Sequence, residues 1–389
     1  MNAPREAVWR LMLAAARRAA GLEADLADLR DNASAIDDWP EAIRGAREHG
    51  LLVLLGRDLI AAHVASSAYL TEAVRHELDR SLAHVRVLRE LTVILSDAGV
   101  NALAFKGPVL SLRLYGDAAT RISADLDIVV ARRDYSLARS TLLAAGFSPH
   151  NEHSAWREEH LFRWLGHASF HRNGTDVELH WRFSPIQFPL HITAESAYTR
   201  GEDSTIGGVR VRGLSDLDNA VVLSAHAARH LYERLEWLSG IVKILTHNEH
   251  RVTEMLVHSR VLGAERALLV TAQVAHIVLG MPLNDTWSTA LAADEDARRL
   301  AADMASALDG YGRNAVPFPE GGSLQMLYSR FLTTRRERTS VLVRTLLMPT
   351  EHDWQSVRLP DVLVPLYWVI RPARLALSYA GRLFGTGQA

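Results

Sequence analysis

The sequence predicts an α+β fold in which a compact unit with a small mixed sheet lies between two helical regions. In residues 1–98, apolar side chains recur at spacings of three and four, which is typical of amphipathic helices. Residues 99–212 contain short β-compatible runs, and we expect about four or five strands there. Residues 213–389 return to helical spacing. Helices followed by strands and then by helices indicate an α+β arrangement.

The length and composition indicate a folded globular protein of two or three packed units. A chain of 389 residues exceeds what one hydrophobic core usually supports, and 48% hydrophobic with 23% charged residues match globular averages. The net charge of −2 excludes a global basic field, so polymeric nucleic acid is not the expected partner. The absence of cysteine excludes disulfides, thiolate metal sites and a cysteine nucleophile. A reducing compartment fits this composition, and a cytoplasmic location is the simplest expectation.

Neither end of the chain carries an apolar block typical of a signal peptide or a membrane span. At the N-terminus, arginines and acidic residues alternate with apolar residues at helical spacing, which is unlike a signal peptide. Near the other end, the apolar run from Val362 to Ile370 is interrupted by Arg371, Arg374 and Arg382, well short of the ~20 residues that a span requires. We expect a terminal amphipathic helix and no transmembrane segment, with peripheral membrane contact as the lesser alternative.

Glycine and proline mark the elements of the central unit. Gly99 ends the last N-terminal helix, and the apolar residues 100–105 suit a buried strand. Pro108 fits the first turn of a short helix that stops at Gly116. The next expected elements are a strand at residues 125–130, a helix at 132–145 and another helix at 155–164.

Two hairpins complete the expected sheet. Residues 167–172 and 175–182 are β-compatible runs separated by Asn173 and Gly174, a pair that tolerates both positive φ values of a type I′ turn. A second, weaker hairpin at residues 206–211 turns on a Gly-Gly pair.

Carboxylates gather on two of these strands. Alternate side chains of a strand share a face, so Asp125 and Asp127 project to the same side. The same parity places Asp176, Glu178 and His180 on one face of the second hairpin strand. Carboxylates held this close repel unless a cation lies between them, and hard oxygen ligands suit Mg²⁺. With Glu178 as the third carboxylate, the set can hold two Mg²⁺ ions, and Asp176 is the spare candidate.

The turn before these carboxylates is suited to phosphate. Lys106 and Gly107 end the first strand and open a helix, so backbone N–H groups and the positive helix end can receive a phosphate. Gly107 leaves room for close approach, and Lys106 supplies a point charge. Arg121 can bind a phosphate or a carboxylate in a bidentate manner. The alternative for Lys106 and Arg121 is an ordinary surface ion pair.

One segment of this unit resembles a known family. Its sequence, residues 104–130, is AFKGPVLSLRLYGDAATRISADLDIVV. It is similar to the uncharacterised nucleotidyltransferase family of the polymerase-beta superfamily, whose members typically show a Lys-Gly turn, a Tyr, an Arg and then an Asp-x-Asp strand. The matching positions are Lys106, Gly107, Tyr115, Arg121, Asp125 and Asp127.

Two later segments extend the resemblance. Residues 177–183, VELHWRF, resemble the family's strand of an acidic residue, Leu, His and Trp, with Glu178 where Asp is usual. Residues 223–245, LSAHAARHLYERLEWLSGIVKIL, resemble its C-terminal part. Family members commonly have Asp two residues after the Trp-Leu pair of this part, where the chain has Gly240.

The resemblance, from about Trp39 to Leu283, implies a polymerase-beta-like core that uses an NTP, with ATP as the expected one, and Mg²⁺. We therefore predict a Mg²⁺-dependent nucleotidyltransferase that moves a nucleoside monophosphate to an acceptor and releases pyrophosphate. The family leaves the acceptor open between a small molecule and a peptide or protein. The departures at Glu178 and Gly240 motivate an alternative, a catalytically idle nucleotide-binding or protein-interaction module on the same fold. A phosphatase or kinase is a more distant alternative.

Histidines and tryptophans near these motifs have packing interpretations. His226 and His230 lie one helical turn apart, and packing is favoured over metal binding because no third ligand is evident. We expect His171 and His180 to face each other across the hairpin, and we do not predict zinc there because the carboxylates compete for the space. Four tryptophans are expected to anchor the core or a domain interface. They are Trp156, Trp164, Trp181 and Trp237.

Overall fold

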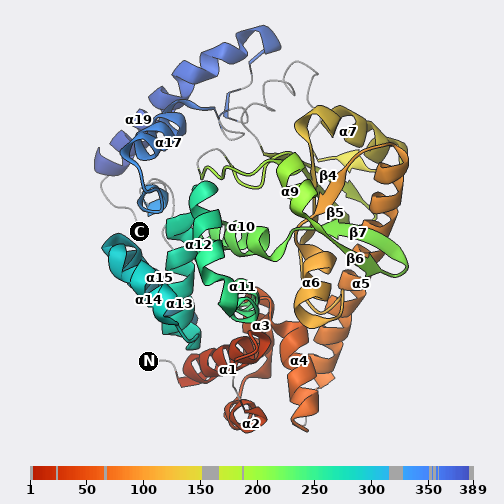
Figure 1. Ribbon diagram of the computed structural model, residues 1–389, viewed down its shortest axis with the longest axis vertical. Coiled ribbons are helices and arrows are strands. Elements are labelled where there is room, and N and C mark those ends of the chain that lie inside the picture. The colour runs from red at the N-terminus through yellow and green to blue at the C-terminus, as the bar shows by residue number, and fades with distance from the viewer. Residues whose placement is uncertain are drawn as a thin grey trace.

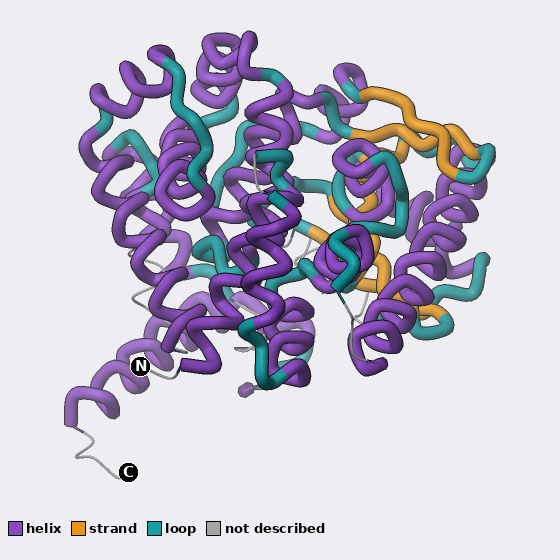
Figure 2. The backbone as a smooth tube through the Cα atoms, turned by 90° about the horizontal axis from the view of Figure 1, so that it is seen from below, coloured by secondary structure: helices purple, strands orange, loops and turns teal. Residues whose placement is uncertain are grey.

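The protein combines one mixed sheet with a large set of helices. The computed structural model describes residues 3–22, 25–64, 68–150, 166–185, 188–314, 327–349, 353, 356–357 and 359–384. The strands gather on one side of the molecule, and most helices lie on the other (Figure 2). The expected α+β class is confirmed. The predicted helix at residues 155–164 and two predicted anchors, Trp156 and Trp164, lie outside the described residues.

The N-terminal region is helical, as the spacing predicts. Its helices are α1 (Ala3–Ala19), α2 (Leu26–Ser34), α3 (Trp39–Glu48), α4 (Leu52–Ala61) and α5 (Ala68–Asp97). Helix α3 begins at a side-chain cap, because a carboxylate oxygen of Asp38 accepts a 3.0 Å hydrogen bond from the backbone N–H of Glu41. Helix α5 leaves the other four and runs along the sheet (Figure 1).

The sheet has seven strands in the order β3-β4-β5-β2-β1-β7-β6. In chain order the strands are β1 (Ala102–Ala104), β2 (Asp125–Val130), β3 (Ser148–Pro149), β4 (His167–Arg172), β5 (Thr175–His180), β6 (Glu202–Ile206) and β7 (Val209–Gly213). The expectation of four or five strands is wrong. Strand β3 has only two residues, too few to give a periodic pattern. The second hairpin joins the sheet through the parallel contact of β7 with β1, which sequence spacing does not reveal.

Both predicted turns are confirmed by positive φ angles. Asn173 and Gly174 have φ values of 51° and 76°, as a type I′ turn requires, and they join β4 to β5. Gly207 and Gly208 have φ values of 53° and 82° and join β6 to β7. The two-residue turns fix the cross-strand register of each hairpin.

Helices cover the sheet and form the second half of the molecule. Short elements of the central unit are α6 (Gly107–Tyr115), the 3₁₀ turn η1 (Arg132–Asp134), α7 (Tyr135–Ala144) and α9 (Ala194–Arg200). The later helices are α10 (Asp216–Arg229), α11 (Leu235–His247), η2 (Glu249–Arg251), α12 (Val252–Val261), α13 (Glu265–Leu279), α14 (Asp285–Ala293), α15 (Glu295–Asn314), α17 (Arg335–Leu347), η3 (Asp361–Leu366) and α19 (Tyr367–Phe384). No helix among the described residues combines the length and apolar character needed to cross a membrane.

Two hydrophobic clusters hold these layers together. The smaller one joins α5 and α7 to one face of the sheet, with Leu91, Leu142 and Leu179 at its centre. The larger one runs from α1 through α10, α11 and α13 to α15, and it includes Leu110 of α6. Helices from the first and last parts of the chain therefore share one core. The division at residues 98 and 212 remains a prediction.

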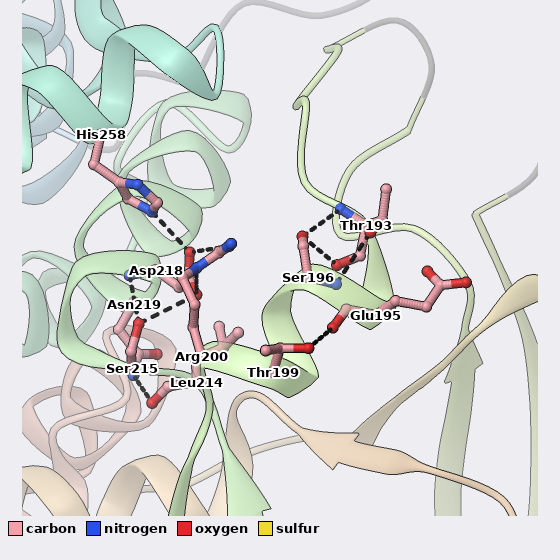
Figure 3. Close-up of polar contacts among 10 residues, drawn as sticks. All are labelled: Thr193, Glu195, Ser196, Thr199, Arg200, Leu214, Ser215, Asp218, Asn219 and His258. Atoms are coloured by element: carbon pink, nitrogen blue, oxygen red, sulfur yellow. Dashed lines mark hydrogen bonds and ion pairs between the residues drawn. The ribbon is translucent and has the colours of Figure 1, made fainter.

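A buried carboxylate ties three helices together beside the sheet. Asp218 of α10 is fully buried and accepts hydrogen bonds of 3.0 and 2.8 Å from the guanidinium of Arg200 on α9 (Figure 3). His258 Nε2 of α12 lies 2.8 Å from its other side, and the Ser215 hydroxyl lies 3.1 Å away. These contacts fix α9, and with it the sheet, against the C-terminal helices.

Candidate functional site

Two parallel strands bring the predicted carboxylates together. Asp125 and Asp127 lie on β2, and Glu178 lies on β5 directly opposite Asp127 in the register. Val177 and Leu179 point into the cluster under α5, so Glu178 lies on the other face of the sheet. The Asp127 side chain is only 3% exposed. The placement expected from strand parity is confirmed, while the catalytic and metal-binding roles remain predictions.

Two basic groups face these carboxylates. Lys106 Nζ lies 3.3 Å from Asp127 Oδ1. His180 Nε2 lies between two acids, 3.0 Å from Asp127 Oδ1 and 3.0 Å from Glu178 Oε2. The Phe105 ring packs edge-on against the His180 ring at 5.3 Å and lies 4.7 Å below the Lys106 ammonium, so one aromatic side chain positions both groups.

The charge of the cluster is unevenly balanced. Burial and the negative charges of Asp127 and Glu178 together raise the pKa of Asp125 to about 6, against the opposing charges of Lys106 and His180. Burial also opposes ionisation of Asp127, but Lys106 and His180 outweigh it and hold the pKa of Asp127 below its usual range. The surroundings of Asp125 therefore disfavour its charged form, and a bound cation would relieve its repulsion by Asp127 and Glu178.

The Lys-Gly turn opens a helix as the sequence predicts. Helix α6 starts at Gly107, whose φ of 55° lies in the left-handed region that favours glycine. A Cβ at Gly107 would lie 3.5 Å from a Leu126 methyl and 3.6 Å from the Ser123 hydroxyl, so the backbone runs close to β2. The Lys106 side chain makes no capping hydrogen bond to α6. The first N–H groups of α6 thus have no side-chain cap from that residue, which suits an anionic ligand.

Arg121 lies in a buried ion pair. Its Nε is 2.7 Å from Glu236 Oε1 on α11, and the two side chains are 5% and 2% exposed. The Ser111 hydroxyl accepts a 2.8 Å hydrogen bond from the Arg121 backbone. Of the two partners considered from the sequence, the guanidinium holds a carboxylate here. The pair joins the sheet unit to the helical bundle, and phosphate contact by Arg121 remains a prediction.

Glu236 explains the glycine at position 240. A Cβ added to Gly240 would lie 3.0 Å from a Leu114 methyl of α6 and 3.7 Å from Glu236 Oε1. A larger residue would require the Leu114 side chain to shift. Glu236, one helical turn earlier, already places a carboxylate in that space. Glu236 was not among the sequence candidates, although it stands inside the Arg-Leu-x-Trp-Leu run.

The histidine pair of α10 packs on α11. The His226 and His230 rings lie 4.8 and 5.2 Å from the Trp237 ring and 4.7 Å from each other. Burial lowers the pKa of His230 to about 3, with the charges of Arg229 and Lys106 acting in the same direction. Neutral, mutually packed imidazoles agree with the packing interpretation of this pair.

Arg229 is a basic residue of the site that sequence analysis missed. Its Nη2 contacts His230 Nε2 at 2.8 Å, and its Nε is buried and has no hydrogen-bond partner among the described residues. Burial lowers the pKa of Arg229, while Tyr328 and the negative charges of Glu178 and Asp127 favour its charged form. The charge of Arg229 therefore interacts with these carboxylates over a distance and not through an ion pair among the described residues. Only its position one residue before His230 hinted at this placement.

The expected histidine contact across the hairpin is wrong. His180 pairs with His167, not with His171, which lies opposite Asp176. The reason is the register of a two-residue turn: counting outward from Asn173 and Gly174 pairs residue 172 with 175 and therefore 167 with 180. His167 Nε2 lies 3.5 Å from Glu178 Oε1, so a second imidazole joins the carboxylates.

Comparison with known proteins assigns a family. A family model described as "Uncharacterised nucleotidyltransferase" matches residues 36–280, more than half of the chain. The chain belongs to this nucleotidyltransferase family. The matched span holds the whole sheet, α10 and α11, and with them all the site residues described above. No curated protein and no solved structure matches the chain.

Proposed function

We propose that this family member is a Mg²⁺-dependent enzyme on a polymerase-beta-like core that transfers a nucleoside monophosphate from an NTP, with ATP expected, to an acceptor. The observation that carries the proposal is the meeting of Asp125, Asp127 and Glu178 on adjacent parallel strands beside the uncapped start of α6. A set of hard carboxylate oxygens with excess negative charge fits Mg²⁺.

The carboxylates are the proposed metal ligands. Asp125, Asp127 and Glu178 would hold the divalent ions, and the raised pKa of Asp125 is the sign of repulsion that an ion removes. When bound, such ions supply charge stabilisation for the phosphates and activation of the attacking oxygen. The acceptor oxygen attacks the α-phosphorus, the bond from that phosphorus to the bridging oxygen breaks, and pyrophosphate leaves with the electron pair.

The basic residues are the proposed phosphate ligands. Lys106 and the N–H groups that follow Gly107 would seat the triphosphate at the start of α6. Arg229 would face the phosphates from α10, because among the described residues its buried Nε has no hydrogen-bond partner and its charge has no carboxylate within ion-pair distance. Binding between the sheet and α10 would exclude water from the reacting groups. The acceptor is proposed to be a small molecule or a peptide or protein, not polymeric nucleic acid.

The proposal is tested with α-labelled NTPs, Mg²⁺ and a panel of small-molecule and peptide acceptors. We expect pyrophosphate release and a labelled product for the native chain. Asp125→Asn should abolish both, because it removes one oxygen ligand while keeping the shape of the side chain. Asp176→Asn is the matched control, since Asp176 lies opposite Asp125 in the register but is exposed and contacts His150 at 3.0 Å. Metal-independent NTP binding that Asp125→Asn leaves unchanged would favour the idle module instead.

A further inference from the structure

Glu178 lies between two imidazoles that the carboxylate site does not require. His167 Nε2 is 3.5 Å from Glu178 Oε1, and His180 Nε2 is 3.0 Å from Glu178 Oε2. The ligand atoms of His167, Glu178 and His180 all lie within 4.8 Å of one another. Strand geometry fixes this arrangement, because His167 and His180 are directly opposite in the hairpin and Glu178 precedes His180 by two residues on the same face.

These separations are those of a metal coordination sphere. Ligand atoms about 2.1 Å from one ion lie roughly 3.0 Å apart at right angles and roughly 3.4 Å apart at tetrahedral angles. The contacts of His180 with Glu178 and with Asp127 are both 3.0 Å, and the contact of His167 with Glu178 is 3.5 Å. An ion centred among His167, Glu178 and His180 would lie beside Asp127, whose Oδ1 contacts His180 Nε2 at 3.0 Å.

The donor set selects the kind of ion. Mg²⁺ prefers oxygen and binds imidazole poorly, whereas Mn²⁺, Co²⁺ and Zn²⁺ accept nitrogen ligands. We infer that His167, Glu178 and His180 form a mixed nitrogen and oxygen site for a first-row transition ion next to a Mg²⁺ site at Asp125 and Asp127. The inference rests on the proposed function, because it assigns the second ion of that site. It replaces a second Mg²⁺ with an ion of a different class.

The neighbouring contacts support a preformed site. The Phe105 ring lies edge-on to His180, and the His167 and His180 rings are 4.9 Å apart, so both imidazoles are held by packing. His171 of the same strand lies opposite Asp176 and contacts His150 instead, with ring centroids 5.7 Å apart. It therefore serves as a matched control on the same hairpin.

The test measures metal binding to the full-length, nucleotide-free protein. Titration with Co²⁺, followed by the visible d–d absorption, should show a site with nitrogen ligands. Pulsed electron paramagnetic resonance of bound Mn²⁺ should show coupling to imidazole ¹⁴N. His167→Ala and His180→Ala should each weaken Co²⁺ binding by about 10- to 100-fold, and His171→Ala should leave it unchanged. His167 has a 41% exposed side chain, so its variant keeps the fold even if the change at buried His180 does not.

The outcomes separate this inference from the proposed function. Equal Co²⁺ affinity in the native chain and His167→Ala, or bound Mn²⁺ without ¹⁴N coupling, would overturn the transition-ion site even if nucleotide transfer is observed. Imidazole-dependent Co²⁺ binding without any transfer would support the site and count against the proposed reaction. Calorimetry with Mg²⁺ alone completes the test, because Mg²⁺ binding that His167→Ala weakens as strongly as Co²⁺ binding would also overturn the inference.

Discussion

Two carboxylate clusters in the described part of the chain differ in how their charge is balanced. At the junction of α9, α10 and α12, a single carboxylate, Asp218, meets the guanidinium of Arg200 and the ring of His258 (Figure 3). On β2 and β5, Asp127 contacts Lys106 and His180, and Glu178 contacts His167 and His180. The carboxylate of the first cluster is paired, whereas Asp125 in the second cluster has no ion pair among the described residues.

This difference distinguishes a structural cluster from one that awaits a ligand. Burial opposes ionisation of Asp218, but hydrogen bonds from His258 and Arg200 hold its pKa below the usual range. Burial and repulsion instead raise the pKa of Asp125 to about 6. A buried charge that lacks a partner is costly, so it persists where an external cation completes the set. We therefore interpret the first cluster as structural and propose a functional role for the second.

The largest effect is expected from Asp127→Asn. The substitution removes the charge that both Lys106 and His180 face, and we expect nucleotidyl transfer to fall on the order of 10⁴-fold, about 5 kcal/mol of transition-state stabilisation. The fold should survive, because His180 can lose its proton when the acid is gone. Steady-state kinetics and a thermal melt measure the two effects. Transfer within tenfold of the native rate would remove Asp127 from the proposed machinery.

A large stability effect is expected from Asp218→Asn. It leaves the Arg200 guanidinium without its bidentate partner inside the junction, and the free energy of unfolding should fall by about 3–5 kcal/mol. Urea unfolding measures the change. Asp203→Asn is the matched control, since Asp203 also has two basic partners, Arg210 and Arg212, but its side chain is 30% exposed and its loss should cost below about 1 kcal/mol. Equal losses in both variants would contradict the contrast drawn here.

The smallest effect concerns pH and has opposite signs in the two clusters. The raised pKa of Asp125 means that the metal-free folded state holds a proton between the ordinary value of 3.8 and about 6, so its stability falls as pH rises through that window. The lowered pKa of Asp218 means that its contribution is lost only as pH falls below 3.8.

Between pH 4 and 6, the free energy of unfolding of the native chain should therefore fall by about 2 kcal/mol because of Asp125, and this fall should be absent in Asp125→Asn. Urea unfolding with a chelator present measures it. Other titrating groups are shared by both proteins and cancel in the difference. Parallel pH profiles for the native chain and the variant would show that Asp125 is not under strain.

Much of the sheet was predictable because its signals are local. Strand β2 has the predicted bounds, and the parity of Asp125 and Asp127 follows from the two-residue period of any strand. The Asn173-Gly174 pair predicted both the hairpin and its tight turn. Counting outward from the same turn gives the His167–His180 pair, so the sequence already contained this contact.

By itself, the sequence determined the fold class, the positions of the acidic strands, the Lys-Gly helix start and the family, because each depends on residues within a few positions of one another. The tertiary structure decided which side chains meet. Arg121 and Glu236 come from elements that are distant in the chain, and nothing periodic in the sequence encodes their contact. Such pairs form only when the apolar faces of separate elements pack together. How they pack depends on all of these faces at once, so no single sequence motif predicts it.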